Sequence, residues 1–94
     1  MIIGLLTIYI HIPGCSSLKE KRSRLKPLLA RLHREFNISA AEIDHNDVWQ
    51  SAAIACALVS NDLNHVQRKL QKILQWVETH WPDVTVMDDH IEII

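Results

Sequence analysis

The N-terminal run of apolar residues constrains the fold more than any other part of the sequence. Residues 2–12 alternate between two sets of side chains, one beginning at Ile2 and the other at Ile3, and both sets are mostly apolar. The β-branched residues of the run and the Pro13-Gly14 turn after it indicate a strand that ends there. A strand that is apolar on both faces belongs in the middle of a sheet, with its second face partly covered.

A helix is predicted directly after this strand. Ser17-Leu18-Lys19-Glu20 has the capping-box pattern, in which the Ser17 hydroxyl accepts from the backbone N–H of Glu20 and the Glu20 carboxylate accepts from that of Ser17. Leucines continue at helical spacing as far as Phe36. Pro27 lies inside this pattern, and we expect it to bend the first turns or to shift the start of the helix.

Two further strands are predicted after this helix. Residues 38–43 indicate a short strand that ends in the turn-like run 44–47. The run 49–60 then alternates as a strand, although its alanines leave a helix as the alternative for residues 48–58. In the strand interpretation, four side chains face the core, namely Ala52, Ile54, Cys56 and Leu58.

A second helix and a last strand complete the pattern. Asn61-Asp62 supplies an N-cap, and apolar residues recur at helical spacing from Leu63 to Val77. Trp81-Pro82-Asp83 ends this helix, and the strand that follows, over residues 84–94, is expected to be interrupted or bulged near 87–89.

The element order β-α-β-β-α-β predicts an α+β protein with a single domain over residues 1–94. The simplest compact solution is a ferredoxin-like sandwich, in which two helices cover one face of a four-stranded antiparallel sheet. The first and third strands lie in the middle, and each helix is expected to connect parallel neighbouring strands with a right-handed crossover. At 48% hydrophobic residues, the chain can build a core without disulfides or metals.

The cysteines and the N-terminus favour a cytoplasmic protein. Cys15 and Cys56 form no CxxC pair, and no basic segment of a signal peptide precedes them. The first apolar run is shorter than the roughly 20 residues that span a bilayer, so no membrane association is predicted. Cys56 is expected to be buried, whereas Cys15 lies in a predicted loop and is expected to be accessible.

Three local patterns resemble a known family. They are Ile12-Pro13-Gly14 leading into Ser17-Leu18-Lys19-Glu20-Lys21-Arg22-Ser23, then Phe36-Asn37-Ile38-Ser39 with Ala41-Glu42-Ile43-Asp44-His45, then Asp47-Val48-Trp49-Gln50 leading to Val59-Ser60-Asn61-Asp62. Over nearly the whole chain, these patterns are similar to the YlxP-like small bacterial proteins, domain of unknown function 503. The resemblance implies a ferredoxin-like fold. Genes of the family that the chain resembles are often found beside those of transcription and translation factors. This association points to a role with RNA or the ribosome.

Charge is strongly segregated along the chain. All ten basic residues lie in the stretches 17–36 and 63–77, together with only two of the eleven acids, Glu20 and Glu35. The formal net charge of −1 therefore hides a cationic layer if both helices cover one side of the sheet. A run of charged residues usually marks a helix face that is exposed to solvent. Such a face normally carries acids between its bases, where they form salt bridges, but here these acids are few. The candidate anion-binding residues are Lys19, Lys21, Arg22, Arg24, Lys26, Arg31 and Arg34.

Two other features would support binding on this layer. The capped helix start at Ser16-Ser17 offers backbone N–H groups for a single phosphate beside the Pro13-Gly14 loop. Trp76 lies off the core stripe of the second helix and is expected to offer an aromatic ring beside the basic residues, whereas Trp49 and Trp81 are expected to be packing anchors.

The face of the sheet that the helices leave open is the second candidate surface. It is expected to be apolar, more so on the first strand than is usual in the family that the chain resembles. An RNA-recognition motif is absent, so the functional interpretation is a homodimer or partner interface. The alternative is that the C-terminus or Trp81 covers this face. The candidate interface residues are Ile3, Leu5, Tyr9, Ala53, Ala55 and Ala57.

Catalysis and metal binding have little support in the sequence. The acids and the histidine within residues 42–47 are possible ligands of a divalent metal ion, and His65 or His90 could be a distant further ligand. Their spacing matches no strong metal-binding motif. Acylphosphatases share the predicted fold but need an Arg in the loop after the first strand, and no basic residue occurs before Lys19. P-loop, nucleophile-elbow and HExxH patterns are absent, so no enzyme, cofactor or metal is predicted.

The sequence therefore predicts a cytoplasmic, non-enzymatic protein that binds RNA or a ribonucleoprotein through its basic helical face and forms a homodimer. The alternative is a protein-interaction or homodimerisation module that works through the apolar open face of the sheet.

Overall fold

The computed structural model describes residues 1–44 and 48–94, with the backbone alone at position 44. It contains four strands and two helices in the predicted order. They are β1 (Ile2–His11), α1 (Leu18–Phe36), β2 (Ser39–Asp44), β3 (Ser51–Ser60), α2 (Leu63–His80) and β4 (Thr85–Ile93). The helix considered as an alternative for residues 48–58 is excluded, because β3 pairs along its whole length with β1.

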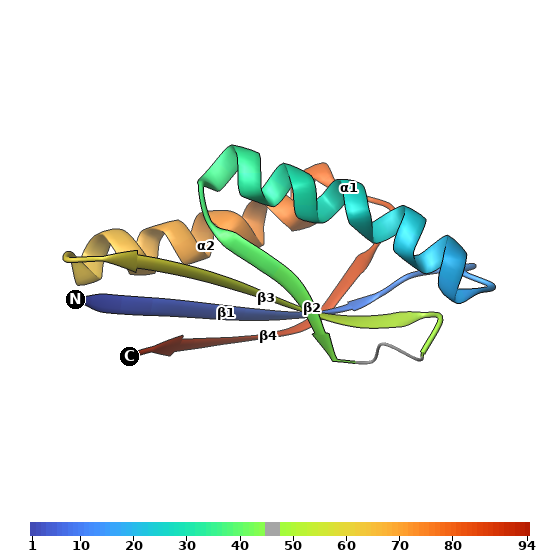
Figure 1. Cartoon of the computed structure of the whole chain (residues 1–94), viewed down its shortest axis with the longest axis horizontal. Coiled ribbons are helices and arrows are strands. Elements are labelled where there is room, and N and C mark those ends of the chain that lie inside the picture. The colour runs from blue at the N-terminus through green and yellow to red at the C-terminus, as the bar shows by residue number, and fades with distance from the viewer. Residues whose placement is uncertain (45–47) are drawn as a thin grey trace.

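The four strands form one antiparallel sheet in the order β2-β3-β1-β4, and both helices lie on the same side of it (Figure 1). This arrangement confirms the predicted fold and the central position of β1 and β3. The prediction that each crossover joins neighbouring strands was wrong. β3 lies between β1 and β2, and β1 lies between β3 and β4, so a hydrogen-bonded antiparallel strand separates each parallel pair.

The core lies between the sheet and the helices. The even-numbered side chains of β1 from Leu6 to Ile10 are buried, as are the four residues of β3 that were predicted to face the core. Seven buried side chains of the helices complete it, namely Leu25, Leu28 and Leu32 of α1 and Val66, Leu70, Ile73 and Val77 of α2. Gly4 allows the close approach of α2 to β1, because a Cβ atom at this position would overlap Cγ1 of Val66.

The start of α1 differs from the predicted capping box in one respect. The Ser17 hydroxyl accepts from the backbone N–H of Glu20 at 3.1 Å, as expected. The Glu20 carboxylate reaches one residue further back, where the Ser16 backbone N–H and hydroxyl donate to it at 2.8 and 2.9 Å. Pro27 does not interrupt or shift the helix, which runs unbroken from Leu18 to Phe36 with Pro27 on its exposed side.

The C-terminal half follows the sequence prediction closely. Asp62 is the N-cap of α2 and accepts from the backbone N–H groups of Asn64 and His65. β4 carries the expected irregularity, since Tyr9 pairs with Asp88 whereas the next residue of β1 pairs with Val86. In the described part of the chain, neither helix is long and apolar enough to cross a membrane.

Candidate nucleic-acid interface

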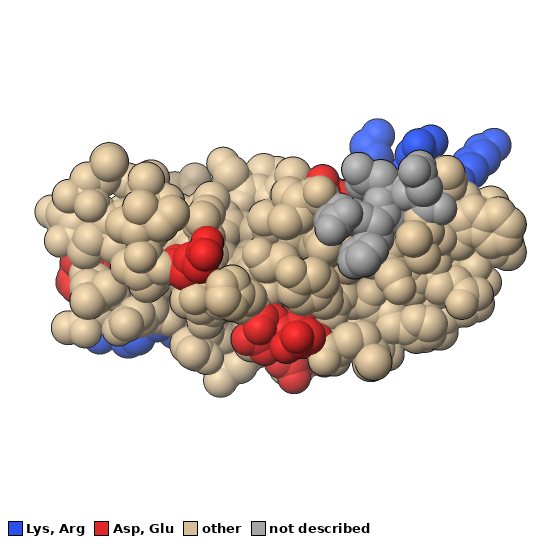
Figure 2. All heavy atoms as spheres, turned by 90° about the horizontal axis from the view of Figure 1, so that it is seen from below, with Lys and Arg blue, Asp and Glu red and all other residues tan. Residues whose placement is uncertain are grey.

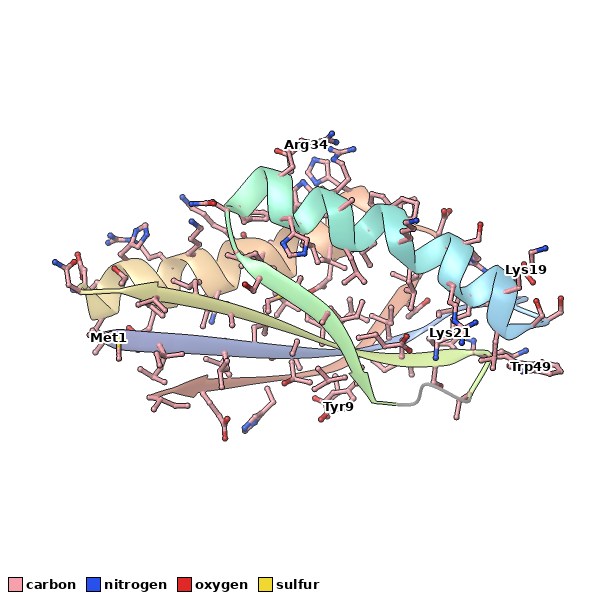
Figure 3. The ribbon with its side chains drawn as sticks, viewed as in Figure 1. Met1, Tyr9, Lys19, Lys21, Arg34 and Trp49 are labelled. Carbon is pink, nitrogen blue, oxygen red and sulfur yellow. The ribbon has the colours of Figure 1, made fainter. Side chains whose placement is uncertain are left out.

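The outer surface of α1 carries a row of exposed cations. Lys19, Arg22, Lys26 and Arg34 follow one another at spacings of one or two turns, and all four are exposed. Figure 3 shows Arg34 projecting from α1 away from the sheet, and Lys19 at the opposite end of the helix. Within the described residues, none of the four forms an ion pair. These four residues are called the α1 basic stripe below.

Lys21 does not belong to this surface, which corrects its place among the predicted anion-binding residues. Its side chain is only 1% exposed and points beneath α1 (Figure 3). The Nζ atom lies 2.7 Å from Oε2 of Glu42 on β2 and donates to the Val48 carbonyl at 2.8 Å. The physical reason is its position on the inner side of the helix, one turn before the buried Leu25. Lys21 therefore connects α1 to β2 and to the residues that lead into β3.

Arg24 and Arg31 are also engaged within the protein. Arg24 donates from its two terminal nitrogens to the carbonyls of Pro13 and Asp83, both at 2.7 Å, and so joins two loops. Arg31 pairs with Glu35 at 3.2 Å, and its guanidinium lies 5.5 Å from the ring centre of Trp76. Both residues are half-buried, so they contribute charge to the helical layer but are already positioned by internal contacts.

The predicted phosphate site at the start of α1 is occupied by a carboxylate of the chain itself. Hydrogen bonds from the Ser16 backbone N–H and then from the Ser16 hydroxyl lower the pKa of Glu20 from its ordinary value of 4.5, and Arg24 adds a smaller effect. The negative charge therefore persists in the position that an external phosphate would need.

The flank of α2 that faces the end of α1 is hollowed. A depression of about 420 Å³ is lined by Phe36 and by four residues of α2, His65, Arg68, Lys69 and Lys72. A second depression of about 320 Å³ shares Phe36 and Lys72 with the first and extends along the helix to Gln75, Trp76, Thr79 and His80. We call these two depressions together the α2 groove.

Aromatic rings form one wall of the α2 groove. Trp76 and His80 stack with ring centres 5.6 Å apart and planes inclined by 16°. Phe36 of α1 meets Trp76 edge to face at 5.8 Å, and Trp81 lies 5.9 Å from it. Trp76 is therefore beside the basic residues, as the sequence indicated, but it is half-buried in this aromatic cluster.

The open face of the sheet presents few charges. In Figure 2, which views the molecule from that side, the surface is mostly uncharged with scattered acids, and Lys and Arg show only at its rim. The Tyr9 side chain projects from this face, away from the helices (Figure 3). Neither suggested cover is present, because the C-terminal strand pairs beside β1 and Trp81 packs against Trp76.

The residues predicted for this face differ in accessibility. Tyr9 is 37% exposed, and Ile3, Leu5, Ala55 and Ala57 are each half-buried in the sheet surface. Ala53 is the exception and corrects the prediction, since it is fully buried. It lies on a central strand between Tyr9 of β1 and the backbone of residue 44 on β2, so its methyl group offers no contact surface.

Other predicted positions have structural roles or lie at the surface. Cys15, expected to be accessible, is buried, and its thiol donates to the Ser17 carbonyl at 3.4 Å. Burial raises the pKa of the Cys56 thiol to about 12. Trp49 is 51% exposed, so its expected role as a packing anchor was wrong.

The acidic turn that was weighed as a metal site lies partly outside the described residues. Positions 45–47 are among those not described. Glu42, at the start of that run, is engaged by Lys21. Among the described residues, no group of three His, Cys, Asp or Glu side chains comes together as metal ligands would.

Comparison with known proteins places this architecture in a family. Residues 3–91 match the family described as "Protein of unknown function (DUF503)". The chain belongs to the DUF503 family. This DUF503 chain is 34% identical over 82 residues to "Uncharacterized protein YlxP" of Bacillus subtilis (strain 168), a match that covers 87% of the chain and 88% of the relative. The resemblance seen in the sequence is thereby confirmed.

A solved structure shares the fold of this DUF503 chain. It is the "De novo designed protein Foldit4", which superposes with a TM-score of 0.54 over 100% of the chain and 97% of the designed protein. The two sequences are only 10% identical, so the similarity concerns the fold alone.

The sequence analysis of this DUF503 protein did not predict the α2 groove as a surface. A signal for it exists, because His65, Lys69, Lys72, Trp76 and His80 recur every three or four residues on one flank of a helix. The basic and aromatic residues were noted separately, but the contribution of Phe36 comes from α1 and depends on how the helices pack.

Proposed function

We propose that this protein binds RNA, alone or within a ribonucleoprotein, through phosphate contacts on its helical layer. The observation that carries the proposal is the α1 basic stripe, four exposed cations in a row that form no ion pair among the described residues. An ordinary solvated helix places acids three or four residues from its bases. Here the two acids of α1 are engaged elsewhere, Glu20 with Ser16 and Glu35 with Arg31.

The geometry favours binding to the phosphate backbone with little sequence selectivity. Lys and Arg on an outward helix surface neutralise phosphates and release counterions, so the affinity falls steeply with salt. Arg24 and Arg31 add positive potential behind the stripe while they hold the loops and the helices together. Lys21 is excluded from this role because its charge is buried against Glu42.

The test is fluorescence anisotropy of a labelled structured RNA titrated with the protein at two salt concentrations. The variant Lys19→Gln, Arg22→Gln, Lys26→Gln removes three charges from the stripe. We expect it to weaken binding at low salt and to reduce the slope of log K against log salt by about 2–3, because each phosphate that the variant no longer neutralises lowers the slope by nearly one.

A matched control changes the net charge equally on the opposite side of the molecule. Ser39→Glu, Thr85→Glu, Ile94→Glu adds three negative charges at exposed positions, in β2, at the start of β4 and directly after β4 where the backbone of Ile94 pairs with Ile3, and is expected to retain most of the affinity and the salt slope. Equal decreases in affinity for both triple variants would contradict a local interface, and no salt-sensitive binding by the parent protein at low salt would refute the proposal.

A second candidate function is self-association through the open face. It is favoured by the exposed or half-exposed apolar side chains of the central strands, which the described part of the chain leaves uncovered (Figure 2). Sedimentation velocity over a range of concentrations tests it. A dimer that Leu5→Lys, Val59→Lys dissociates would support it, with Leu63→Lys at an exposed position of α2 as the control. A protein that stays monomeric at high concentration excludes it.

A further inference from the structure

We infer that the α2 groove is a subsite for unpaired nucleotides, distinct from the α1 basic stripe. The inference rests on the proposed RNA binding and specifies which form of RNA the protein takes. The groove combines two chemistries that single-stranded nucleic acids require, namely cations that follow the backbone and aromatic surface for the bases. Arg68, Lys69 and Lys72 supply the cations, and Phe36, Trp76 and His80 supply the aromatic wall.

The cations of the groove are available to a ligand. Arg68 and Lys72 are exposed and Lys69 is half-buried. In the described part of the protein, none of the three forms an ion pair, and neither depression is lined by a carboxylate. Three unneutralised charges in a concave surface concentrate positive potential, because a hollow with low-dielectric walls focuses the field.

The length of the groove fits a strand of several nucleotides. Its lining residues extend along α2 from His65 to His80, which corresponds to about 22 Å at 1.5 Å per residue. The cations occupy the N-terminal part of this distance and the rings the C-terminal part. Phe36 and Lys72 line both depressions and so join the two parts.

The position of the rings selects unpaired bases. Phe36 and Trp76 are half-buried side chains that line the hollow, so a base must leave its stack to reach them. A duplex presents only its backbone to such a surface and is expected to engage the exposed α1 basic stripe instead. An acidic peptide would satisfy the cations, but it has no ring to place against the aromatic wall.

The wall is already organised before a ligand arrives. Trp76 is held by His80, Phe36 and Trp81, and Arg31 lies over its ring. His80 is the exposed member of this cluster and stacks on Trp76, so it extends the aromatic surface toward solvent. Side chains that are fixed in place lose little conformational entropy on binding.

The test compares a labelled single-stranded 12-nucleotide oligouridine with a 12-base-pair RNA duplex by anisotropy at low salt. Arg68→Gln, Lys72→Gln alters the groove, and Lys19→Gln, Arg22→Gln removes the same charge from the α1 basic stripe. We expect the groove variant to weaken single-strand binding at least tenfold and duplex binding less than threefold. His80→Ala, at an exposed position, is expected to weaken single-strand binding about fivefold because its ring no longer stacks on a base.

A second readout reports on the wall directly. In a Trp49→Phe background, the remaining tryptophans are Trp76 and Trp81, which lie together beside the groove. Oligouridine is expected to quench their fluorescence, whereas the duplex is expected to leave it unchanged.

The outcomes separate the two proposals. If the groove variant weakens both RNAs equally, or if oligouridine binds without quenching, the groove is not a single-strand subsite although RNA binding stands. Competition by poly-glutamate as effective as that of unlabelled oligouridine would also overturn the inference, in favour of an acidic protein partner. If neither RNA binds the parent protein, the proposed function itself fails.

Discussion

A buried lysine decides how the β2 edge of the molecule is held. Lys21 pairs with Glu42 and donates to the Val48 carbonyl, so one ammonium group contacts both β2 and the segment that enters β3. Removing water from a charge is costly unless its partners are well placed, and removing one partner leaves the other charge uncompensated. Lys21 therefore contributes to the positioning of these segments rather than to the surface charge.

We expect Lys21→Ala to lower the free energy of unfolding by about 3 kcal/mol, because it leaves Glu42 without its cation and creates a cavity under α1. Urea denaturation at pH 7 measures the change. Lys19→Ala, at an exposed position of the same helix turn, is the control and is expected to stay within about 0.5 kcal/mol of the parent. The double variant Lys21→Met, Glu42→Leu is expected to recover much of the stability, since a matched apolar pair leaves no buried charge. Equal stability of Lys21→Ala and the parent would show that the pair has no structural role.

Glu20 provides a prediction about pH. Its pKa is lowered in the folded protein by hydrogen bonds from Ser16, so the carboxylate contributes stability above its ordinary pKa of 4.5. That contribution is lost as the pH falls through the lower pKa of the folded state. We expect Glu20→Gln to lower the urea midpoint at pH 7 and the difference from the parent to shrink at pH values below 4.5. The difference should be smaller in a Ser16→Ala background, and a difference that persists unchanged at pH values well below 4.5 would contradict this account.

At the scale of elements, the packing of α2 on β1 determines the geometry of the helical layer. α2 approaches the sheet at Gly4, where the absence of a side chain leaves room for Val66 and Leu70. The other end of the layer is held by Arg24, which joins the loop after β1 to the loop before β4. Both interactions fix where the flank of α2 lies relative to Phe36 at the end of α1, and so shape the α2 groove.

We expect Gly4→Ala to lower the free energy of unfolding by about 1–3 kcal/mol, because the added methyl group overlaps the Val66 side chain and forces the helix outward. Chemical denaturation measures the decrease. In a Val66→Ala background the same substitution is expected to cost less, since the obstructing methyl groups are gone. Additive effects of the two substitutions would show that they do not interact.

At the scale of the whole molecule, the fold places residues of different charge, which are segregated along the sequence, on two opposite faces. The helical layer gathers the basic residues, whereas the open face has a mostly uncharged surface with scattered acids (Figure 2). The molecule measures 42 × 23 × 20 Å, and its helices lie along its length (Figure 1). The α1 basic stripe and the α2 groove are therefore both long surfaces, and Phe36 at the end of α1 lines the groove.

Since this surface exists only in the folded state, a bound RNA should stabilise the protein. At a concentration of the 12-base-pair RNA duplex ten times its dissociation constant, the increase is about 1.4 kcal/mol, or a rise of about 5–10 °C in Tm for a chain of this size. Differential scanning fluorimetry at low salt measures the rise. Lys19→Gln, Arg22→Gln, Lys26→Gln is expected to show a smaller rise at the same RNA concentration, and an equal rise would indicate binding elsewhere.

The sequence by itself determined the order of the elements, the central position of β1 and β3 in the sheet, and the family. Alternation along β1 and β3 is a local property of the chain, and the caps at Ser17 and Asp62 depend only on neighbouring residues. These features do not require knowledge of distant contacts, which is why the β-α-β-β-α-β pattern could be predicted from composition and spacing.

Tertiary structure decided which charged residues are available at the surface. Lys21 and Lys19 look alike in sequence, but the inner side of α1 buries the first against Glu42, a residue on another element, and leaves the second in water. Phe36 joins residues of α2 in one hollow only because the helices pack side by side. Burial and concavity depend on contacts between distant segments, so local spacing predicted the cationic layer but not its stripe and its groove.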